Sequence, residues 1–473
     1  MVSAPLIAVI LTAMVALLTL GNWRYGLLCI IVIGVMQDVL RKLTPEAPPF
    51  YIVWSMLAFG FVAAVALGRN ALGSLRELWM GDDTLKVAFY LYFLVVIVQC
   101  LHSLLRWESP LVPLFGLIFY LGPVVALLVV IGFAKQEIWL NRFIGTYLLI
   151  MVPVCLTVYL SLLFKDSVPV LRDVGSFLGN QLVIYDVGTV LYSYPGLLRV
   201  GEIAAFHAAV CCAFLSMLML GKTGWLRGRL WYALLIIALV GAIALTGRRK
   251  MLMALCIFWV LQFYFLTALR GGASRQAVVI LVLGLVFSVA IGLAGESETS
   301  LYLQRGSTVF SGMDERVSTA INLFLSAIDR SSGVGLGAGI AAQGARFAGI
   351  DNSLFVGGSS ESGIGLLVVE LGIPGFIIIV WLLFNLARVV VAKLKAVARI
   401  DDHLLLYAVS FAALLLANMA TFSVATQLYG DYFVLITLGV VAGMLYSTIN
   451  RGIRKRALYI AILAQVSARR TSD

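Results

Sequence analysis

The stretch "LVPLFGLIFYLGPVVALLVVIGF", residues 111–133, runs through 23 residues without a single charged side chain. A helix needs about 20 mostly apolar residues to cross a bilayer, so this stretch predicts a transmembrane helix. The rest of the chain has the same character, because 62% of its 473 residues are hydrophobic and only 12% are charged. A soluble domain has about a quarter charged residues. The composition therefore predicts an all-α polytopic membrane protein, with residues 1–473 forming a single membrane-embedded domain.

Thirteen apolar runs of this kind can be found along the chain, and two of them are short, so we expect 12 to 14 transmembrane helices. The first residues lack the basic segment of a cleaved signal peptide, so we expect the first helix to be retained. The runs are 5–20, 26–37, 50–67, 86–105, 111–133, 143–164, 202–220, 231–246, 251–269, 276–294, 363–384, 403–420 and 432–447.

The distribution of lysine and arginine predicts the orientation of the helices, because short cytoplasmic loops carry the excess of positive charge. With the C-terminus inside, 21 of the 34 lysines and arginines fall in inner segments and 13 in outer ones. Thirteen helices then put the N-terminus outside. Residues 448–473 form a basic cytoplasmic tail, in which 452–470 is predicted to be an interfacial helix on anionic lipid.

Two long connections, 165–201 and 295–362, fall on the outer face in this topology. Long loops in compact proteins are usually functional or disordered. In the second loop, residues 314–330 read "DERVSTAINLFLSAIDR", with apolar residues at helical spacing on one face. A glycine-rich turn, "GVGLGAG" at 333–339, follows. We expect this loop to be a folded lid on the membrane surface.

Three cations occupy the tight outer connection "TGRRKML", residues 246–252. Arg248, Arg249 and Lys250 could pin a turn at the membrane surface by snorkelling. The positive-inside rule disfavours such a cluster outside, however, and arginine forks suit phosphate oxygens. The functional interpretation is an anion site at the outer leaflet.

Further charged residues are predicted on the same face. Arg199 and Glu202 begin the helix that starts near residue 202, either as an interfacial ion pair or with Arg199 joining the anion site. Arg316 begins the amphipathic helix of the large loop, and Arg305 lies nearby in the sequence. His207 lies about two turns deeper and is predicted to be a structural hydrogen-bonding residue.

Two carboxylates mark the return of the large loop to the membrane, in "SSESGIGLLVVELGIPGF" at 359–376. Glu361 stands at the boundary between loop and helix, where it could serve as a general base or simply as a carboxylate favoured by the helix dipole. Glu370 lies more than two turns deeper and is assigned a structural role. Gly335 and Gly337 could let the backbone approach a ligand closely, or could serve turn geometry alone.

In order and topology these motifs resemble the family of bacterial O-antigen ligases and O-antigen or exopolysaccharide polymerases, best over residues 190–450. Arg248 to Leu252 matches that family's Arg-x-x-x-Leu hairpin motif, and Arg316 matches the arginine of its large periplasmic loop. "GVGLG" at 333–337 and "ELGIPG" at 370–375 match the segments that follow. The ligases carry a histidine where this chain has Glu361, and this departure favours a polymerase.

The resemblance implies a membrane glycosyltransferase of the C type (GT-C) in the bacterial inner membrane, with its active site facing the periplasm. The donor would be a glycan on undecaprenyl pyrophosphate, and the acceptor the sugar end of another lipid-linked repeat unit. Glu361 would be the base, and Arg248, Arg249, Arg316 and Arg199 would bind the pyrophosphate. Possible substrate contacts are Glu202, Lys250, Gly335, Gly337 and Arg305.

No Asp-x-Asp motif occurs in the chain, so we expect neither a divalent metal nor another cofactor. The expected partners are membrane lipids, with a flippase and a chain-length regulator as candidates, and no nucleic acid. Two alternatives remain open. One is a ligase that transfers the glycan to lipid A core or another acceptor, and the other is a transporter of lipid-linked sugars. A transporter would favour paired halves or discontinuous helices in both halves, and the sequence has no internal repeat.

Overall fold

The computed structural model describes residues 3–79, 81–177, 183–186, 189–221, 226–270, 302, 313–342, 345, 348–350, 362–398 and 401–470. Helices account for most of this part of the chain. The long helices are α1 (Ala4–Gly21), α2 (Trp23–Leu43), α3 (Phe50–Leu78), α4 (Asp83–Trp107), α5 (Leu111–Phe133), α6 (Glu137–Phe164), α8 (Gly201–Leu220), α9 (Leu226–Leu245), α10 (Arg249–Arg270), α13 (Met313–Ser331), α15 (Gly363–Val397), α16 (Asp402–Val424) and α17 (Tyr432–Arg470).

The helices confirm the polytopic membrane architecture. Twelve of the thirteen predicted runs fall on these helices, and the run 276–294 lies outside the described residues. In the described part of the chain, 10 helices are long and apolar enough to cross a membrane. The count of thirteen stays a prediction, as does the side of the membrane on which each loop lies.

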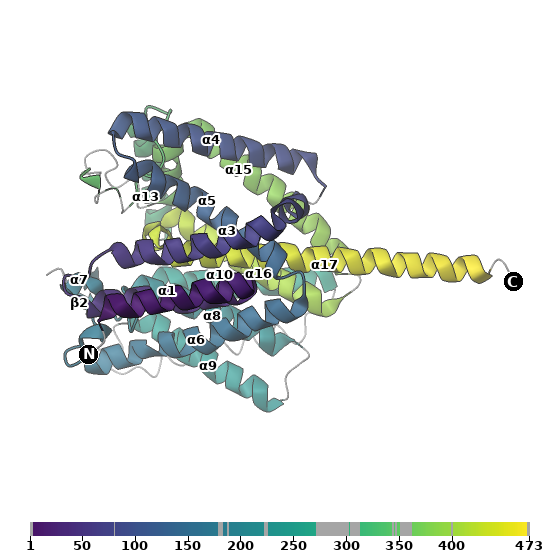
Figure 1. Ribbon diagram of the computed structural model, residues 1–473, viewed down its shortest axis with the longest axis horizontal. Coiled ribbons are helices and arrows are strands. Elements are labelled where there is room, and N and C mark those ends of the chain that lie inside the picture. The colour runs from purple at the N-terminus through teal and green to yellow at the C-terminus, as the bar shows by residue number, and fades with distance from the viewer. Residues whose placement is uncertain are drawn as a thin grey trace.

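The bundle has two ends, which differ in what they carry (Figure 1). We call one the loop end: it holds residues 44–49, 165–177, 183–186, 189–200, 246–248 and 425–431, and lies on the left in Figure 1. We call the other the tail end: it holds residues 79, 81–82, 134–136 and 401, and α17 projects from it on the right. Residues 452–470 are helical, as predicted, and continue α17 unbroken to Arg470. Their interfacial position stays a prediction.

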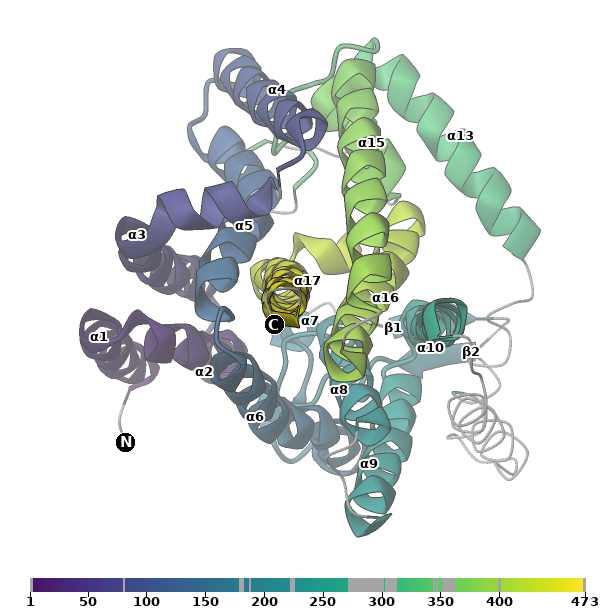
Figure 2. The ribbon, with the colours of Figure 1, turned by 90° about the vertical axis from the view of Figure 1, so that its right-hand side faces the viewer.

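The last helix lies in the middle of the bundle, with the other helices around it (Figure 2). Of the predicted span of α17, 89% is buried inside the protein, compared with 17% of the span of α1. Its side chains at Val440, Val441 and Met444 join the largest apolar cluster. Since α17 and α16 are joined by residues 425–431, this turn is held at the centre of the loop end.

The connection between α6 and α8 is folded at the loop end. It contains a short 3-10 helix η1 (Pro169–Leu171), a helical turn α7 (Val174–Phe177) and a hairpin of β1 (Val183–Asp186) and β2 (Thr189–Tyr192). The two strands are antiparallel, with Val183 opposite Tyr192 and Asp186 opposite Thr189.

In the large connection, α13 spans Met313–Ser331 and confirms the predicted amphipathic helix. It lies beside α15 at the edge of the bundle (Figure 2), where the rings of Phe324 and Phe376 are 5.7 Å apart. A second short 3-10 helix, η4 (Gln427–Gly430), lies between α16 and α17.

Helix α15 is broken within its apolar part. Gly372 has φ 72° and ψ 180°, and Pro374 follows it, so the regular pattern of helix hydrogen bonds is interrupted there. Backbone groups of residues 333–338 replace hydrogen bonds of the interrupted helix. Leu336 N–H donates to Val369 O at 2.7 Å, and Ile373 N–H donates to Gly333 O at 2.9 Å. The glycine-rich segment is therefore packed into the break in α15. Irregular backbone at such a position is tolerated where it is buried in protein.

Candidate functional site

The best-defined charged cluster lies at the loop end, where α8 begins and α9 turns into α10. Glu202, in the first turn of α8, places Oε1 2.9 Å from Arg248 Nη1 and 2.8 Å from Lys250 Nζ. All three side chains are largely buried, with exposures of 9%, 22% and 15%. We call these three residues the cation cluster. Two cations share one carboxylate, so the cluster has a formal surplus of one positive charge.

The local geometry that brings these residues together follows from the tight α9–α10 turn. Thr246 closes the end of α9, and its Oγ1 accepts the backbone N–H of Arg248 at 3.3 Å. Lys250 Nζ also reaches Gln427 Oε1 of η4 at 3.4 Å, which links the cluster to the α16–α17 turn. Two of the three cations in "TGRRKML" therefore face a carboxylate, that of Glu202, in addition to forming the turn.

Arg199 contacts two other carboxylates, those of Asp431 and Asp38. Its Nη2 lies 2.6 Å from Asp431 Oδ2, and its backbone N–H donates to Asp38 Oδ2 at 3.0 Å. The Asp431 side chain is 1% exposed, so this ion pair is buried. The structure places Arg199 in a pair with Asp431 rather than in the cation cluster, and its predicted contact with an anion stays a prediction.

The other predicted site residues are only partly described. Arg249 begins α10 beside the cation cluster and has an interaction partner of its own. Arg316 lies on α13, but its side chain is outside the described part of the chain. Arg305 and Glu361 also lie outside the described residues, and so does any contact between them and the cation cluster.

Sequence reasoning missed a buried lysine that organises this end. Lys42, in the last turn of α2, is 3% exposed. Its Nζ donates to the carbonyl oxygens of Val170 at 3.1 Å, Gly196 at 2.9 Å and Leu198 at 2.5 Å. A buried ammonium is costly unless its three donors are satisfied, and here all three have an acceptor. The available signal was Asp38 four residues before Lys42 at the end of an apolar run.

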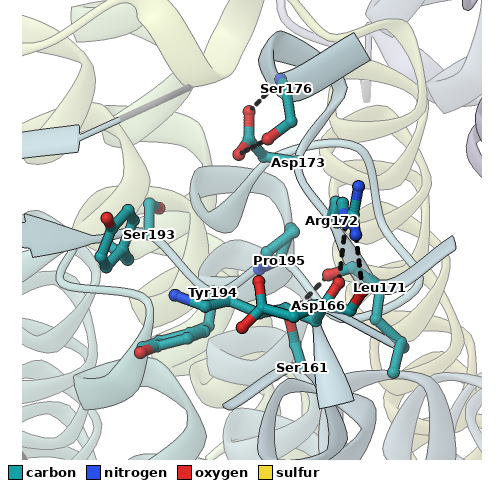
Figure 3. Close-up of a pocket in the computed structure, with 11 residues that line it drawn as sticks. Ser161, Asp166, Leu171, Arg172, Asp173, Ser176, Ser193, Tyr194 and Pro195 are labelled. Carbon is teal, nitrogen blue, oxygen red and sulfur yellow. Dashed lines mark hydrogen bonds between the residues drawn. The ribbon is translucent and has the colours of Figure 1, made fainter. Parts of the chain in front are cut away.

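An open polar cavity lies next to these residues, lined by the end of α6 and by the connection between α6 and α8 (Figure 3). Its volume is about 380 Å³. We call it the loop-end cavity, and it is lined by Ser161, Lys165, Asp166, Leu171, Arg172, Asp173, Ser176, Tyr192, Ser193, Tyr194 and Pro195.

The loop-end cavity adjoins the cation cluster through the backbone. Ser193 Oγ donates to Thr246 O at 3.0 Å, and Thr246 is two residues before Arg248. In addition, the hydroxyl of Tyr302 donates to Tyr192 O at 2.9 Å, so a residue of the large 295–362 connection reaches the same wall. Tyr302 of the large connection therefore contacts a residue of the cavity lining, which the sequence did not predict.

Gly335 and Gly337 take part in the joint between the glycine-rich segment and the membrane helices. A Cβ on Gly337, whose φ is 101°, would lie 2.7 Å from Ser103 Cα of α4. Gly335 also has a positive φ and packs against the backbone at Glu370 and Gly372. In the described part of the chain these two glycines serve close backbone packing, and a substrate contact stays a prediction.

Glu370 completes this joint as a buried hydrogen-bond acceptor. It is 2% exposed, and its carboxylate accepts the Tyr120 hydroxyl at 2.7 Å and the Ala341 N–H at 2.8 Å. The predicted structural role of Glu370 agrees with these contacts. Its partners are the Tyr120 hydroxyl of α5 and the backbone N–H groups of Gly339, Ala341 and Ala342, at the end of the glycine-rich segment and just after it.

His207 likewise has the environment of a structural residue. It is fully buried, and its Nδ1 lies 2.7 Å from the Tyr147 hydroxyl on α6. Its ring also packs 4.6 Å from the ring of Phe433. The histidine therefore links α6, α8 and α17 in the core.

Comparison of the chain with known protein families finds no match, and comparison with curated protein sequences finds none either.

Proposed function

We propose that the chain is a bacterial polysaccharide polymerase, a membrane glycosyltransferase of the GT-C type. It would join lipid-linked repeat units at the periplasmic face of the inner membrane. The observation that carries the proposal is the cation cluster, in which Arg248 and Lys250 share the single carboxylate of Glu202 beside an open polar cavity. A diphosphate is the kind of group that such a surplus of buried positive charge would stabilise.

In the proposed reaction an acceptor hydroxyl attacks the anomeric carbon of the donor sugar. The carbon–oxygen bond to the pyrophosphate breaks, and undecaprenyl pyrophosphate leaves with the bonding electron pair. Arg248, Arg249 and Arg316 would stabilise the negative charge that grows on the leaving group, with Arg199 as a further member. The hydroxyl proton would pass to Glu361 as general base. No step in this scheme requires a metal ion.

The difference between the two ends of the bundle supports a proposal for the side of the membrane on which the site lies. The loop end holds the described parts of the α6–α8 connection and the cation cluster, while the tail end holds the basic extension of α17. With the tail inside, as the lysine and arginine distribution predicts, the cation cluster would face the periplasm.

The decisive experiment is polymerisation in proteoliposomes supplied with an undecaprenyl-pyrophosphate-linked repeat unit. Arg248→Ala should reduce chain extension by at least a hundredfold, the size expected when a preorganised charge is removed from the leaving group. Arg248→Lys should recover only part of the rate, because lysine lacks the planar fork. Arg388→Ala, which removes a half-exposed arginine at the tail end, is the matched control and should extend chains normally.

Glu361 can be tested in the same assay. Glu361→Gln should lower extension by about a hundred- to ten-thousandfold if the carboxylate is the base. A helix-terminal role would cost at most about 1 kcal/mol of stability and leave turnover near normal. Wild-type polymer yield from both Arg248→Ala and Glu361→Gln would refute the proposed site.

The acceptor distinguishes the two enzymatic alternatives. Extension of lipid-linked units indicates a polymerase, whereas transfer to lipid A core or to a protein without extension indicates a ligase. Movement of the lipid-linked sugar across the bilayer without new glycosidic bonds would indicate a transporter. A flippase and a chain-length regulator are the partners expected for a polymerase.

A further inference from the structure

The loop-end cavity is separate from the cation cluster and has a different chemical character. It is lined by the end of α6 and the residues that follow it, by the turn that contains η1 and α7, and by residues 192–195 at the end of β2 and after it (Figure 3). At about 380 Å³ it lies in the size range of small-molecule sites. The charged residues on its wall are two cations, Lys165 and Arg172, and two carboxylates, Asp166 and Asp173.

This lining fits a polyhydroxylated ligand better than the other ligand classes found at a membrane surface. A lipid chain would require a continuous apolar wall, and a bare anion would require a surplus of cations, which this wall lacks. Sugar hydroxyls donate to carboxylates and accept from ammonium and guanidinium groups, while the apolar face of a sugar ring can lie against an aromatic ring. Tyr192 and Tyr194 supply aromatic rings beside the charged groups.

Some of the lining residues hold the walls together. Arg172 donates from Nε to Lys165 O at 2.8 Å and from Nη2 to Asp166 O at 2.6 Å. The Asp173 carboxylate accepts the N–H of Ser176 at 3.0 Å and its hydroxyl at 2.7 Å. Figure 3 shows these bonds on the inner wall. Arg172 and Asp173 are therefore committed largely to the fold of the loop.

Other lining residues remain available to a ligand. Tyr192 is 38% exposed, and Lys165 Nζ lies 3.6 Å from the centre of its ring. The Asp166 side chain is exposed, and Arg172 bonds to its backbone oxygen rather than to its carboxylate. An exposed ring, an ammonium on its face and a carboxylate nearby form a recognition surface for hydroxyl groups.

The cavity is also preorganised. Lys42 ties the carbonyls of Val170, Gly196 and Leu198 together, so the two loop segments that flank the cavity share one buried cation. Val174 N–H donates to Arg199 O at 2.9 Å, which adds a direct bond between the same segments. A wall held in this way loses little freedom when a ligand binds.

We propose that the loop-end cavity is a sugar-binding subsite, which takes a phosphate-free sugar residue through Tyr192, Lys165 and Asp166. The identity of that sugar as part of a lipid-linked glycan rests on the proposed function. The bond from Ser193 to Thr246 places the subsite beside the cation cluster, so one ligand could present its diphosphate to Arg248 and a sugar to Tyr192.

The test uses the full-length protein in nanodiscs and a panel of short oligosaccharides without lipid or phosphate. The panel contains neutral, uronate-containing and amino-sugar members. Binding is measured by saturation-transfer NMR and calorimetry. At least one member should bind the wild-type protein, and Asp166→Asn and Tyr192→Ala should each weaken its binding about tenfold or more. Tyr192→Phe keeps the ring and should bind within about threefold of wild type.

Two controls separate folding from recognition. Arg388→Ala at the tail end should leave sugar binding unchanged, and thermal unfolding should show that Asp166→Asn, a change at an exposed side chain, folds normally. Failure of every oligosaccharide to bind the wild-type protein overturns the subsite. So does equal binding by wild type, Asp166→Asn and Tyr192→Ala.

The same variants distinguish this inference from the proposed function. Arg248→Ala should lose chain extension and keep the binding of the free oligosaccharide. If the wild-type protein binds oligosaccharide but never extends a chain, the polymerase proposal fails and the sugar subsite stands. If chains are extended and the cavity variants bind sugar normally, the subsite fails and the polymerase proposal stands.

Discussion

Ion pairs occur at both ends of the bundle, and the Arg199–Asp431 pair at the loop end is far more deeply buried than two of the pairs at the tail end. At the loop end, Arg199 is 11% exposed and its partner Asp431 only 1%. At the tail end, Arg388 is 50% exposed and Lys455 is 53% exposed. Exposed pairs contribute little to stability, and buried pairs repay their desolvation cost only with good geometry. Apolar residues could replace the buried ion pair at the loop end without loss of stability. The presence of the pair therefore favours a functional role for these charges.

The tail-end pairs have a simpler physical explanation. Arg388 pairs with Asp82, which is the N-cap of α4, and Lys455 pairs with Asp401, which is the N-cap of α16. Each pair joins a long helix to the beginning of another at the edge of the bundle. These contacts suit charges near solvent at helix ends, and nothing in them points to a ligand.

The largest difference should appear when the same substitution is made at each end. Arg199→Met leaves Asp431 buried without its cationic partner, while the backbone N–H that binds Asp38 is kept, so the free energy of unfolding should fall by about 3–5 kcal/mol. Arg388→Met at the tail end removes an exposed pair and should cost about 0–1 kcal/mol. Equilibrium unfolding in mixed detergent micelles measures both.

The double variant Arg199→Met with Asp431→Asn sharpens this result. Asparagine keeps an oxygen for the Val434 N–H, which Asp431 accepts at 2.9 Å, while it removes the unpaired charge. Most of the lost stability should return. Equal costs for Arg199→Met and Arg388→Met would remove the distinction between the two ends.

The second prediction concerns Glu370, a buried carboxylate that contacts no cation in the described part of the chain. Glu370→Ala removes the acceptor of the Tyr120 hydroxyl and of the backbone N–H groups of Gly339, Ala341 and Ala342. Each buried group left unsatisfied costs about 1–3 kcal/mol, so we expect a loss of about 2–4 kcal/mol in the free energy of unfolding.

Tyr120→Phe is the matched variant, because it removes the one side-chain donor and leaves the carboxylate bonded to the backbone N–H groups of residues 339–342. It should cost less than half as much as Glu370→Ala in the same unfolding measurement. If Glu370→Ala is as stable as the wild type, the joint between α15 and the glycine-rich segment does not depend on this carboxylate.

A third prediction tests whether Glu202 occupies the place of an anion in the cation cluster. Glu202→Gln leaves Arg248 and Lys250 without a carboxylate, so an incoming diphosphate no longer competes with one. We expect undecaprenyl pyrophosphate to bind about tenfold more tightly, a change of about 1.4 kcal/mol. Fluorescence titration in nanodiscs measures the Kd.

The tail-end control for this experiment is Asp82→Asn, which removes the carboxylate that faces Arg388. Because that arginine is half exposed and far from any candidate anion site, the Kd should stay within about twofold of wild type. Weaker binding by Glu202→Gln would mean that the carboxylate supports the geometry of Arg248 and Lys250 more than it competes with the ligand.

The fold was largely predictable because lipid imposes a simple rule on sequence. An unbroken apolar run such as 111–133 has to satisfy its backbone within one helix, and twelve such runs are helices in the described part of the chain. Hydropathy marks only the apolar middle of a helix, however. It therefore ended the last run at 447, whereas α17 continues through polar residues to Arg470.

The candidate site was predictable only as a set of charges. The sequence places Arg248, Lys250 and Glu202 at helix ends on one face, and the structure brings these three together. Periodicity carries no information on partners distant in sequence, such as Asp431 for Arg199 or three backbone carbonyls for Lys42. The loop-end cavity was missed for the same reason, since its lining combines two segments that only the fold brings together.

The smallest effect is expected at Asp401, where the tail end can be titrated. Partial burial raises the pKa of this carboxyl, but hydrogen bonds from the Lys455 ammonium and from the N–H groups of Leu404 and His403 outweigh it and hold the pKa below its usual value. A carboxyl with a lowered pKa stabilises the folded state above its unfolded pKa of about 3.9, and this contribution is lost as the pH falls through the folded pKa.

Asp401→Asn keeps an oxygen for the helix cap and loses the charge. It should be less stable than wild type by about 0.2–1 kcal/mol at pH 7, with the gap closing below about pH 4. Lys455→Met should show the same small gap at pH 7, and 1 M salt should shrink the difference for wild type by screening the pair. A gap above about 2 kcal/mol, or one that persists at pH 3, would place a strongly coupled charge at the tail end and erase the contrast with Arg199.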